Sequence, residues 1–203
     1  MKRTFLLVML GLTTSMSPAV GQGCIRLDNY DSSGPIVTYG VGTGPVGTGL
    51  DYLWSVGLYY ALGDVRGDIL ADPSGILEPS LLGPLVLGTG SGCSAIFDSG
   101  WTASMPGYFS SGPVFSVPGG NPGDIITLMV VAYEGASYQT TIFRGHSTAF
   151  TMILAADGIP AFDNSVGYFM PGFSVYAIIP EPGTLVLAVG CGLASLTLWW
   201  RRH

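Results

Sequence analysis

The sequence predicts an all-β fold: an antiparallel β-sandwich with one apolar helix before it and another after it. Gly (31 residues) and Pro (14 residues) are abundant in the 203-residue chain, and both disfavour long helices. Between the two ends, short apolar or alternating runs are bounded by Gly and Pro, which is typical of strands joined by tight turns. Only 10% of the residues are charged and 48% are hydrophobic, which excludes ordinary disorder.

The N-terminus has the three parts of a secretory signal peptide. Lys2-Arg3 is basic, Phe5–Leu12 is apolar but too short to span a membrane, and Ala19-Val20-Gly21 is a run of small residues. We therefore expect residues 1–21 to be removed by cleavage after Gly21. A core helix and lipid attachment at Cys24 are the alternatives. The glycine three positions before Cys24 argues against lipid attachment, which usually has an aliphatic residue there.

The C-terminus has the features of a membrane-spanning helix. Thr184–Trp200 contains no charged residue and would be roughly 26 Å long as a helix. Its last two residues are tryptophans, which favour the membrane interface, and Arg201 and Arg202 follow, which favour the cytoplasmic side. We expect a transmembrane helix over 184–200, with residues 22–179 outside. The alternative is a buried core helix.

The segment Pro180-Glu181-Pro182 lies directly before this apolar run. The three parts together resemble the PEP-CTERM sorting signal of bacterial exported proteins, over residues 180–203. The resemblance implies that an exosortase, a membrane-embedded cysteine protease, recognises the tail and processes it near the Pro-Glu-Pro. The sorting-motif residues would be Pro180, Glu181, Pro182, Arg201 and Arg202. The region before the tail loosely resembles the Gly-rich β ectodomains that often precede this signal.

Residues 22–179 are the predicted sandwich. Ile125–Tyr133 is the most hydrophobic run and should be a central strand, which turns at 134–137 into a hairpin with Tyr138–Phe143. Gly67–Leu82 should hold a short helix or an irregular excursion. The other expected strands are Cys24–Leu27, Ile36–Val41, Tyr52–Ala61, Leu85–Leu87, Val114–Val117, Phe150–Leu154 and Phe173–Ile179.

The charge of this region excludes some partners. Twelve of the 13 acidic residues lie within 22–179, but only Arg26, Arg66 and Arg144 of the seven basic ones do, so the region carries nine net negative charges (12 − 3). An acidic surface repels phosphate backbones, and we expect no nucleic-acid partner.

Cysteine usage leaves one question open. Cys191 lies in the predicted membrane helix, whereas Cys24 and Cys93 lie in the exported part, where a disulfide between them can form. The sequence does not show whether their Cα atoms are close enough.

Several motifs can be read as functional or as structural. Gly42–Gly47 matches G-x-G-x-x-G, but no helix start follows it, and a hairpin loop is preferred. His146, with Ser147 and Asp157, allows a hydrolytic triad, although no nucleophile-elbow motif supports one. We prefer His146 as a loop or strand-edge residue. One exported His and two distant Cys exclude a zinc site.

The acidic and aromatic residues also allow two interpretations. Asp28-Asn29-Tyr30-Asp31 and the set Asp64, Asp68 and Asp72 offer oxygen ligands for calcium, but neither has the EF-hand spacing. Solvated turns are the preferred interpretation.

A group of aromatic residues could form a sugar-stacking platform, but we prefer to interpret them as part of a hydrophobic core. These residues are Tyr52, Trp54, Tyr59, Tyr60, Trp101, Tyr108 and Phe109.

Three functional hypotheses follow. The first is an exported non-enzymatic protein, tethered to the membrane or released at the cell surface and sorted by an exosortase; the resemblance adds an extracellular-matrix or biofilm role. The alternative is an extracellular carbohydrate-binding module that binds polysaccharide, recognisable by a coplanar row of exposed aromatic residues. The third is a secreted hydrolase, which needs an acid pair or a His–Ser contact in a cleft. We expect no cofactor and no metal.

Overall fold

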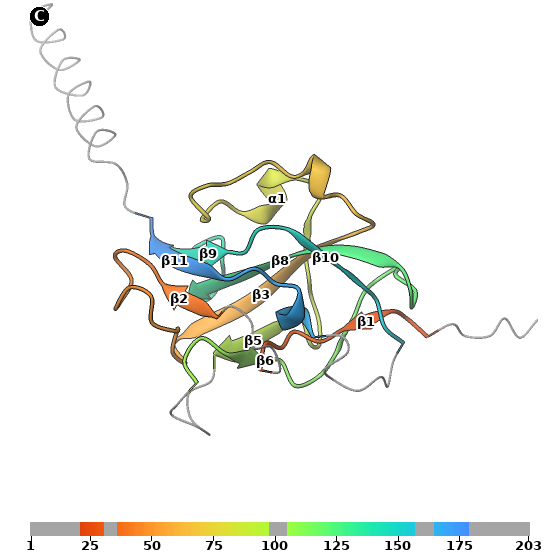
Figure 1. The fold of residues 1–203 in the computed structure, drawn as a ribbon, viewed down its shortest axis with the longest axis horizontal. Helices are drawn as coiled ribbons and strands as arrows, with labels where there is room; N and C mark the ends of the chain where they lie inside the picture. Colours follow the sequence, from red (N-terminus) through yellow and green to blue (C-terminus); the bar gives the residue numbers. More distant parts are fainter. Residues whose placement is uncertain (1–20, 31–35, 98–104, 157–164, 179–203) are drawn as a thin grey trace, which may run out of the picture.

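The computed structural model describes residues 21–30, 36–97, 105–156 and 165–178. This part of the chain is built of strands with very little helix, which confirms the all-β prediction. None of its helices is long and apolar enough to cross a membrane. The predicted span at 184–200 lies outside the described residues. In chain order (Figure 1), the elements are β1 (Cys24–Ile25), β2 (Val37–Tyr39), β3 (Trp54–Leu62), η1 (Arg66–Asp68), α1 (Pro79–Leu82), β4 (Val86–Leu87), β5 (Ser94–Phe97), β6 (Phe109–Ser110), β7 (Phe115–Ser116), β8 (Ile125–Glu134), β9 (Phe143–His146), β10 (Phe150–Ile153), η3 (Val166–Tyr168) and β11 (Phe173–Ala177).

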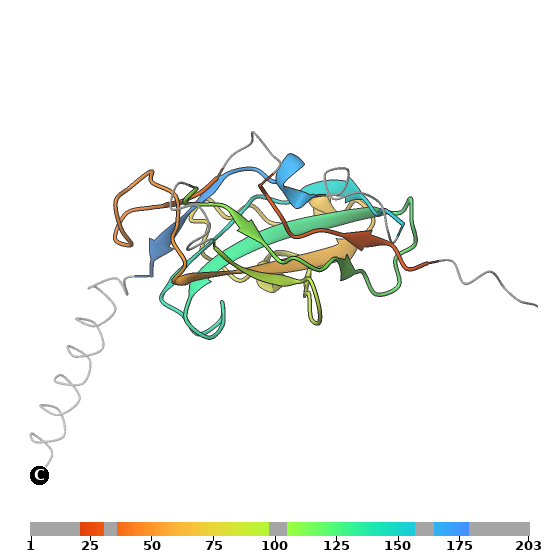
Figure 2. The same cartoon turned by 90° about the horizontal axis from the view of Figure 1, so that it is seen from below.

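Two long antiparallel strands form the centre of the molecule. β3 pairs with β8 over its whole length, from Trp54 opposite Glu134 to Leu62 opposite Ile126, and Figure 2 shows the two strands side by side. The nine-stranded sheet runs in the order β2-β11-β9-β8-β3-β5-β6, with β10 also on β8 and β4 also on β3. Its pairs are antiparallel except for β11 with β2, which is parallel.

Both faces of this central pair are covered. Trp54, Val56 and Leu58 of β3 share the first face with Leu128 and Val130 of β8. This face packs against residues from the small β1–β7 sheet and its flanks, namely Ile25, Leu27, Phe115 and Val117. The second face, which carries Tyr59, Met129 and Val131, packs against Leu82, Leu85 and Tyr138. The sheet therefore lies between two hydrophobic clusters.

The segment Cys24–Asp28 ties the outer elements together. Cys24 lies between Ser116 of β7 and Ala155, which follows β10, and it is antiparallel to both. Further along the segment, Arg26 forms a bridge with Ser165, and Asp28 forms one with Ser110 of β6. One short segment therefore links four parts of the chain that are distant in sequence.

Most of the expected strands are confirmed, with one exception and two omissions. A strand over Tyr138–Phe143 is wrong, because residues 138–140 form a turn and β9 starts only at Phe143. Tyr138 packs inward on the second face, and the Thr141 amide donates to the Ser137 carbonyl. β5 and β6 were not predicted. The excursion expected over Gly67–Leu82 is confirmed, and it carries part of η1 and all of α1.

The two covered faces lead to a stability prediction. Val130 and Val131 point to opposite faces, yet each side chain is 0% exposed. We expect Val130→Asp and Val131→Asp to lower the free energy of unfolding by several kcal/mol each, because both bury an unpaired charge. Ile153→Asp, at a side chain that is 61% exposed, is the control and should change it by less than about 1 kcal/mol. Urea unfolding measures all three, and full tolerance at either valine would contradict the two-sided core.

Candidate functional site

A buried contact between an aspartate and a histidine holds the excursion over the second face. Asp72 lies in the loop between η1 and α1, and His146 is the last residue of β9. The Nε2 atom of His146 is 3.0 Å from Oδ2 of Asp72, and each side chain is only 3% exposed. Asp72 and His146 also line a cavity of about 230 Å³, together with apolar residues such as Leu70, Leu82 and Met129.

Contacts at both ring nitrogens fix the orientation of the His146 ring. Nε2 faces the Asp72 carboxylate, and Nδ1 lies 2.8 Å from the Ser147 carbonyl oxygen. The ring is therefore held between the loop that carries Asp72 and the end of β9, and both side chains of the pair are removed from water.

The Asp72 carboxylate accepts several further hydrogen bonds. Its Oδ2 accepts from the amides of Ile76 (3.0 Å) and Leu77 (2.8 Å), and its Oδ1 accepts from the amide and hydroxyl of Ser74. Burial by itself would raise the pKa of Asp72, but the hydrogen bonds from Ser74, Leu77 and His146 outweigh it and hold the pKa well below its usual range. The Asp72 carboxylate is therefore ionised, and in this form it holds the loop in place by accepting these hydrogen bonds.

The hydrolytic arrangement considered for His146 is not formed in the described residues. The Ser147 hydroxyl accepts from the Val130 amide at 3.0 Å, and the Ser147 amide donates to the Val130 carbonyl. Ser147 is therefore bonded to β8, while both nitrogens of His146 are bonded elsewhere. Asp157 lies outside the described residues. We expected His146 in a loop or at a strand edge; it is the last residue of β9, which lies between β8 and β11, and Asp72 is the partner that the sequence did not reveal.

A second polar group, the polar cluster, lies on the same face and consists of Tyr59, Glu78, Tyr138, Gln139 and Arg144. The Tyr59 hydroxyl donates to Glu78 Oε1 (3.2 Å), and Gln139 Nε2 donates to the Tyr59 hydroxyl (2.7 Å) and to Glu78 (3.3 Å). The Arg144 guanidinium donates to the Tyr138 carbonyl (2.7 Å) and lies 5.0 Å from the centre of the Tyr138 ring. The cluster joins β3 and α1 to the β8–β9 connection.

Burial and charge set the protonation of this cluster. Burial, followed by the Glu78 charge, raises the pKa of Tyr59 above its usual range, so its hydroxyl stays a donor. For Glu78, burial would raise the pKa, but hydrogen bonds from Ser80, Gln139 and Tyr59 and the Arg144 charge lower it overall. Glu78 is therefore an anion with four stabilising neighbours.

The other acidic residues considered as calcium ligands are used in local structure. Asp28 accepts from the Tyr30 amide (2.8 Å) and from the Ser110 hydroxyl (2.7 Å). Asn29 is fully buried and bonds to the backbone of Gly107 and Phe109. Asp64 forms an exposed ion pair with Arg66, and Asp68 belongs to η1. Asp31 lies outside the described residues, within which no three His, Cys, Asp or Glu side chains gather as a metal site.

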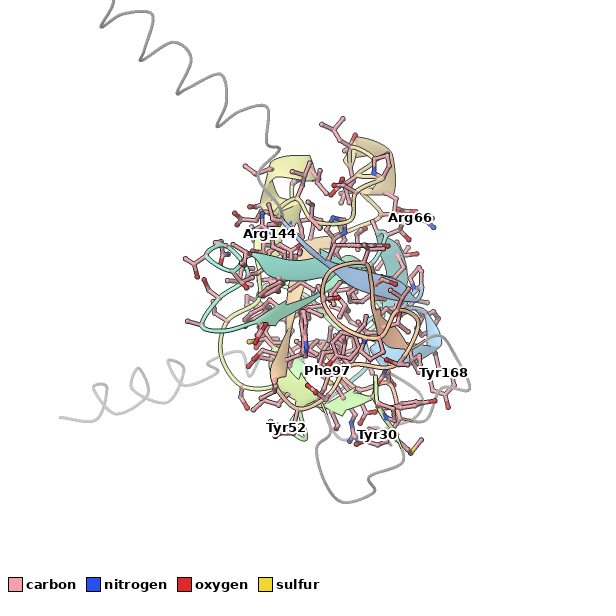
Figure 3. All side chains as sticks on the ribbon, turned by 90° about the vertical axis from the view of Figure 1, so that its left-hand side faces the viewer. Tyr30, Tyr52, Arg66, Phe97, Arg144 and Tyr168 are labelled. Atoms are coloured by element: carbon pink, nitrogen blue, oxygen red, sulfur yellow. The ribbon has the colours of Figure 1, made fainter. Side chains whose placement is uncertain are left out.

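The described aromatic residues that were considered for sugar stacking are divided between the core and the surface. Trp54 is 3% exposed, and Tyr59 and Phe109 are 0% exposed, so these three belong to the core. Tyr60 is half-buried, and its ring lies 5.6 Å from that of Phe115. Tyr52 is 56% exposed, the Tyr108 ring lies 5.7 Å from that of Tyr30, and Trp101 lies outside the described residues. Figure 3 shows Tyr30 and Tyr52 toward the end of the molecule opposite Arg66 and Arg144.

Two further motifs take structural roles. Gly42–Gly47 lies in the loop between β2 and β3, as expected, and Gly42 and Gly47 both have positive φ angles. Cys24 and Cys93 are both buried, and the Cys93 thiol donates to the Gly90 carbonyl at 2.9 Å. Cys93 is a free thiol in this structure, and the pairing with Cys24 stays a prediction.

The sorting-motif residues lie beyond the described part of the chain, which ends at residue 178. These are Pro180, Glu181, Pro182, Arg201 and Arg202. Comparison with protein-family models, with curated proteins and with solved structures found no match to this chain. Any functional assignment therefore has to rest on the residues themselves.

The Asp72 pair leads to a pH prediction. Because its folded-state pKa is lowered, Asp72 contributes stability that is fully present above the unfolded-state pKa of about 3.9 and is lost as pH falls below that value. We expect Asp72→Asn to be less stable than the wild-type chain at neutral pH, and its free energy of unfolding to vary less between about pH 5 and pH 2.5.

Urea unfolding at a series of pH values, in about 0.5 M salt to screen exposed pairs, measures this difference. Asp68→Asn is the matched control, since Asp68 is an exposed residue of η1, and its curve should follow that of the wild-type chain. Parallel curves for Asp72→Asn and the wild-type chain would show that the Asp72 charge does not stabilise the fold.

Proposed function

We propose that this chain is an exported, non-enzymatic protein that is tethered to the membrane or released at the cell surface, and that an exosortase sorts it through residues 180–203. The observation that carries this proposal is the tail itself, in which Pro180-Glu181-Pro182, the uncharged run 184–200 and Arg201-Arg202 follow one another. The order of the chain supports it. The last described strand, β11, ends at Ala177, and the Ile178 amide donates to Ile142, so the described part of the sheet reaches to within two residues of the Pro-Glu-Pro.

We infer further that residues 22–179 form a β-sandwich ectodomain. One layer would be the nine-stranded sheet, and the other would be built around β1, β7 and the segment Cys24–Asp28. The support is the first hydrophobic cluster, in which Ile25 and Phe115 of the small sheet pack against the central strands. The parallel pair of β2 and β11 makes this sandwich mostly, rather than entirely, antiparallel.

The use of the acidic residues supports a non-catalytic role. Asp28, Asp64, Asp72 and Glu78 are each bonded to groups that hold a turn, a loop or the polar cluster. A general acid or base instead needs a carboxyl group free to exchange a proton with a substrate. With nine net negative charges, the ectodomain also has the solubility expected of a protein outside the cell. An extracellular-matrix role would require such a location.

The start of the mature chain is the first test of this proposal. Gln22 donates from its side chain to the Val117 carbonyl, and the Gly23 amide donates to Gly120, so cleavage after Gly21 would leave the folded domain intact. We expect N-terminal sequencing of the native protein to begin at or near Gln22. A chain that still begins at Met1 would contradict export through a cleaved signal peptide.

The sorting motif is the second test. We expect Glu181→Ala to leave the melting temperature unchanged, because a residue in a linker buries little surface, but to block tail removal in a host with an exosortase. Glu134→Ala changes an exposed acidic residue at the end of β8 and is the matched control, with normal processing. The mass of the mature protein from each strain measures this. Normal processing of Glu181→Ala, or processing in a host without exosortase, would refute the assignment.

A further inference from the structure

A cavity of about 340 Å³ lies on the second face of the sheet, beside the polar cluster. Its floor contains Gly57 of β3 and Val131 of β8, which are directly opposite each other. Its walls come from residues 87–94 and from the β8–β9 connection at 136–139. We call it the tyrosine pocket after its residues Tyr133 and Tyr138; Thr89, Ser137 and Gln139 also line it.

Glycine at position 57 keeps the floor of the tyrosine pocket open. A Cβ atom at this position would be 3.1 Å from Cγ2 of Val131 and 3.6 Å from the Tyr133 ring. The neighbouring residues Val56 and Leu58 belong to the cluster on the first face. The central strand therefore has a side-chain gap on the second face, and the Tyr133 ring borders it.

The aromatic wall of the pocket is held in place by its neighbours. The rings of Tyr133 and Tyr138 meet edge to face, with centres 6.2 Å apart and planes at 86°. The Tyr138 hydroxyl donates to the Leu77 carbonyl (3.1 Å), and Arg144 lies over the Tyr138 ring. A ligand would meet a surface that is already ordered, which reduces the entropy lost on binding.

The polar groups of the pocket can pair with hydroxyl groups. Gln139 uses its amide nitrogen on Tyr59 and on Glu78, and the Glu78 carboxylate can only accept, so the amide carbonyl is what Gln139 can offer to a ligand. Burial raises the pKa of Tyr133, which keeps its hydroxyl protonated as a donor. Thr89 adds a hydroxyl that can both donate and accept. The Ser137 hydroxyl shares a hydrogen bond with that of Thr140 (2.9 Å) and still has a lone pair to accept another.

The charge of the lining decides between ligand classes. The described residues that line the tyrosine pocket include no Asp, Glu, Lys, Arg or His. A charged ligand would lose its hydration without gaining a counter-charge, which is costly. A neutral ligand with an apolar ring face and several hydroxyl groups matches both the aromatic wall and the polar groups.

We propose that the tyrosine pocket binds a neutral sugar residue, as found in an uncharged extracellular polysaccharide. The sugar ring would lie against Tyr133, with its hydroxyls toward Gln139, Thr89 and Ser137. This binding activity goes beyond the proposed sorting and does not depend on it, because the pocket is built only from residues 57–139.

The test uses the full chain, purified in a zwitterionic detergent because glycosidic detergents carry a sugar. Calorimetry with neutral hexasaccharides of glucose, galactose and mannose is compared with calorimetry of oligouronic acids. The variants are Tyr133→Leu, which removes the ring, and Thr89→Val, which removes one hydroxyl at similar volume. Tyr52→Leu is the matched control, because Tyr52 is exposed and lies toward the other end of the molecule from Arg144 (Figure 3).

We expect at least one neutral hexasaccharide to bind and the oligouronic acids to bind much more weakly. Tyr133→Leu should weaken binding roughly tenfold and Thr89→Val about threefold, with Tyr52→Leu unchanged. A melting temperature for each variant separates lost binding from lost folding. Absence of binding to every neutral sugar, preference for the charged ones, or equal loss in Tyr52→Leu would overturn the proposal. Tail processing is measured separately in cells, so a failure of the sugar-binding proposal can be distinguished from a failure of the sorting assignment.

Discussion

The pairing of β3 with β8 is the contact on which the other layers of this protein depend. The two strands share nine register positions, from Trp54 with Glu134 to Leu62 with Ile126, and each strand has further strands on its outer edge. Because both faces of the pair are apolar, neither can be left to water. The small sheet covers the first face, and the segment between β3 and β4 covers the second together with the β8–β9 connection.

The cover on the second face is held by polar contacts as well as by apolar ones. Thr127 of β8 is fully buried; its hydroxyl donates to the Gly63 carbonyl and accepts from the Val65 amide. Asp72 is bonded to His146, and Glu78 to Tyr59. These three contacts fix the excursion at its start, its middle and its end. Apolar contacts alone do not fix the conformation of a long loop that lies over an apolar sheet. Directional hydrogen bonds do, because they depend on distance and angle.

The sequence predicted the strands better than it predicted the site. Ile125–Tyr133 is the most hydrophobic run, which predicts a central strand, and β8 is buried on both faces as such a run requires. The strand expected at Tyr138–Phe143 is wrong, because Tyr138 packs inward from a turn and not from a strand. The Asp72–His146 pair joins residues 74 positions apart, and no local pattern encodes such a distance. The tyrosine pocket likewise depends on where two separate loops meet the central strands.

The parallel pairing of β2 with β11 has a consequence for how the chain reaches this structure. Thr38 and Ser174 form a hydrogen bond across a sequence separation of 136 residues, and Cys24–Asp28 is bridged to residues as late as Ser165. Contacts of such long range close large loops and slow folding. The pairing of β2 with β11 thus has to wait until Phe173–Ala177 has left the ribosome. Until then Val37–Tyr39 lacks its parallel partner, although it is made early in synthesis.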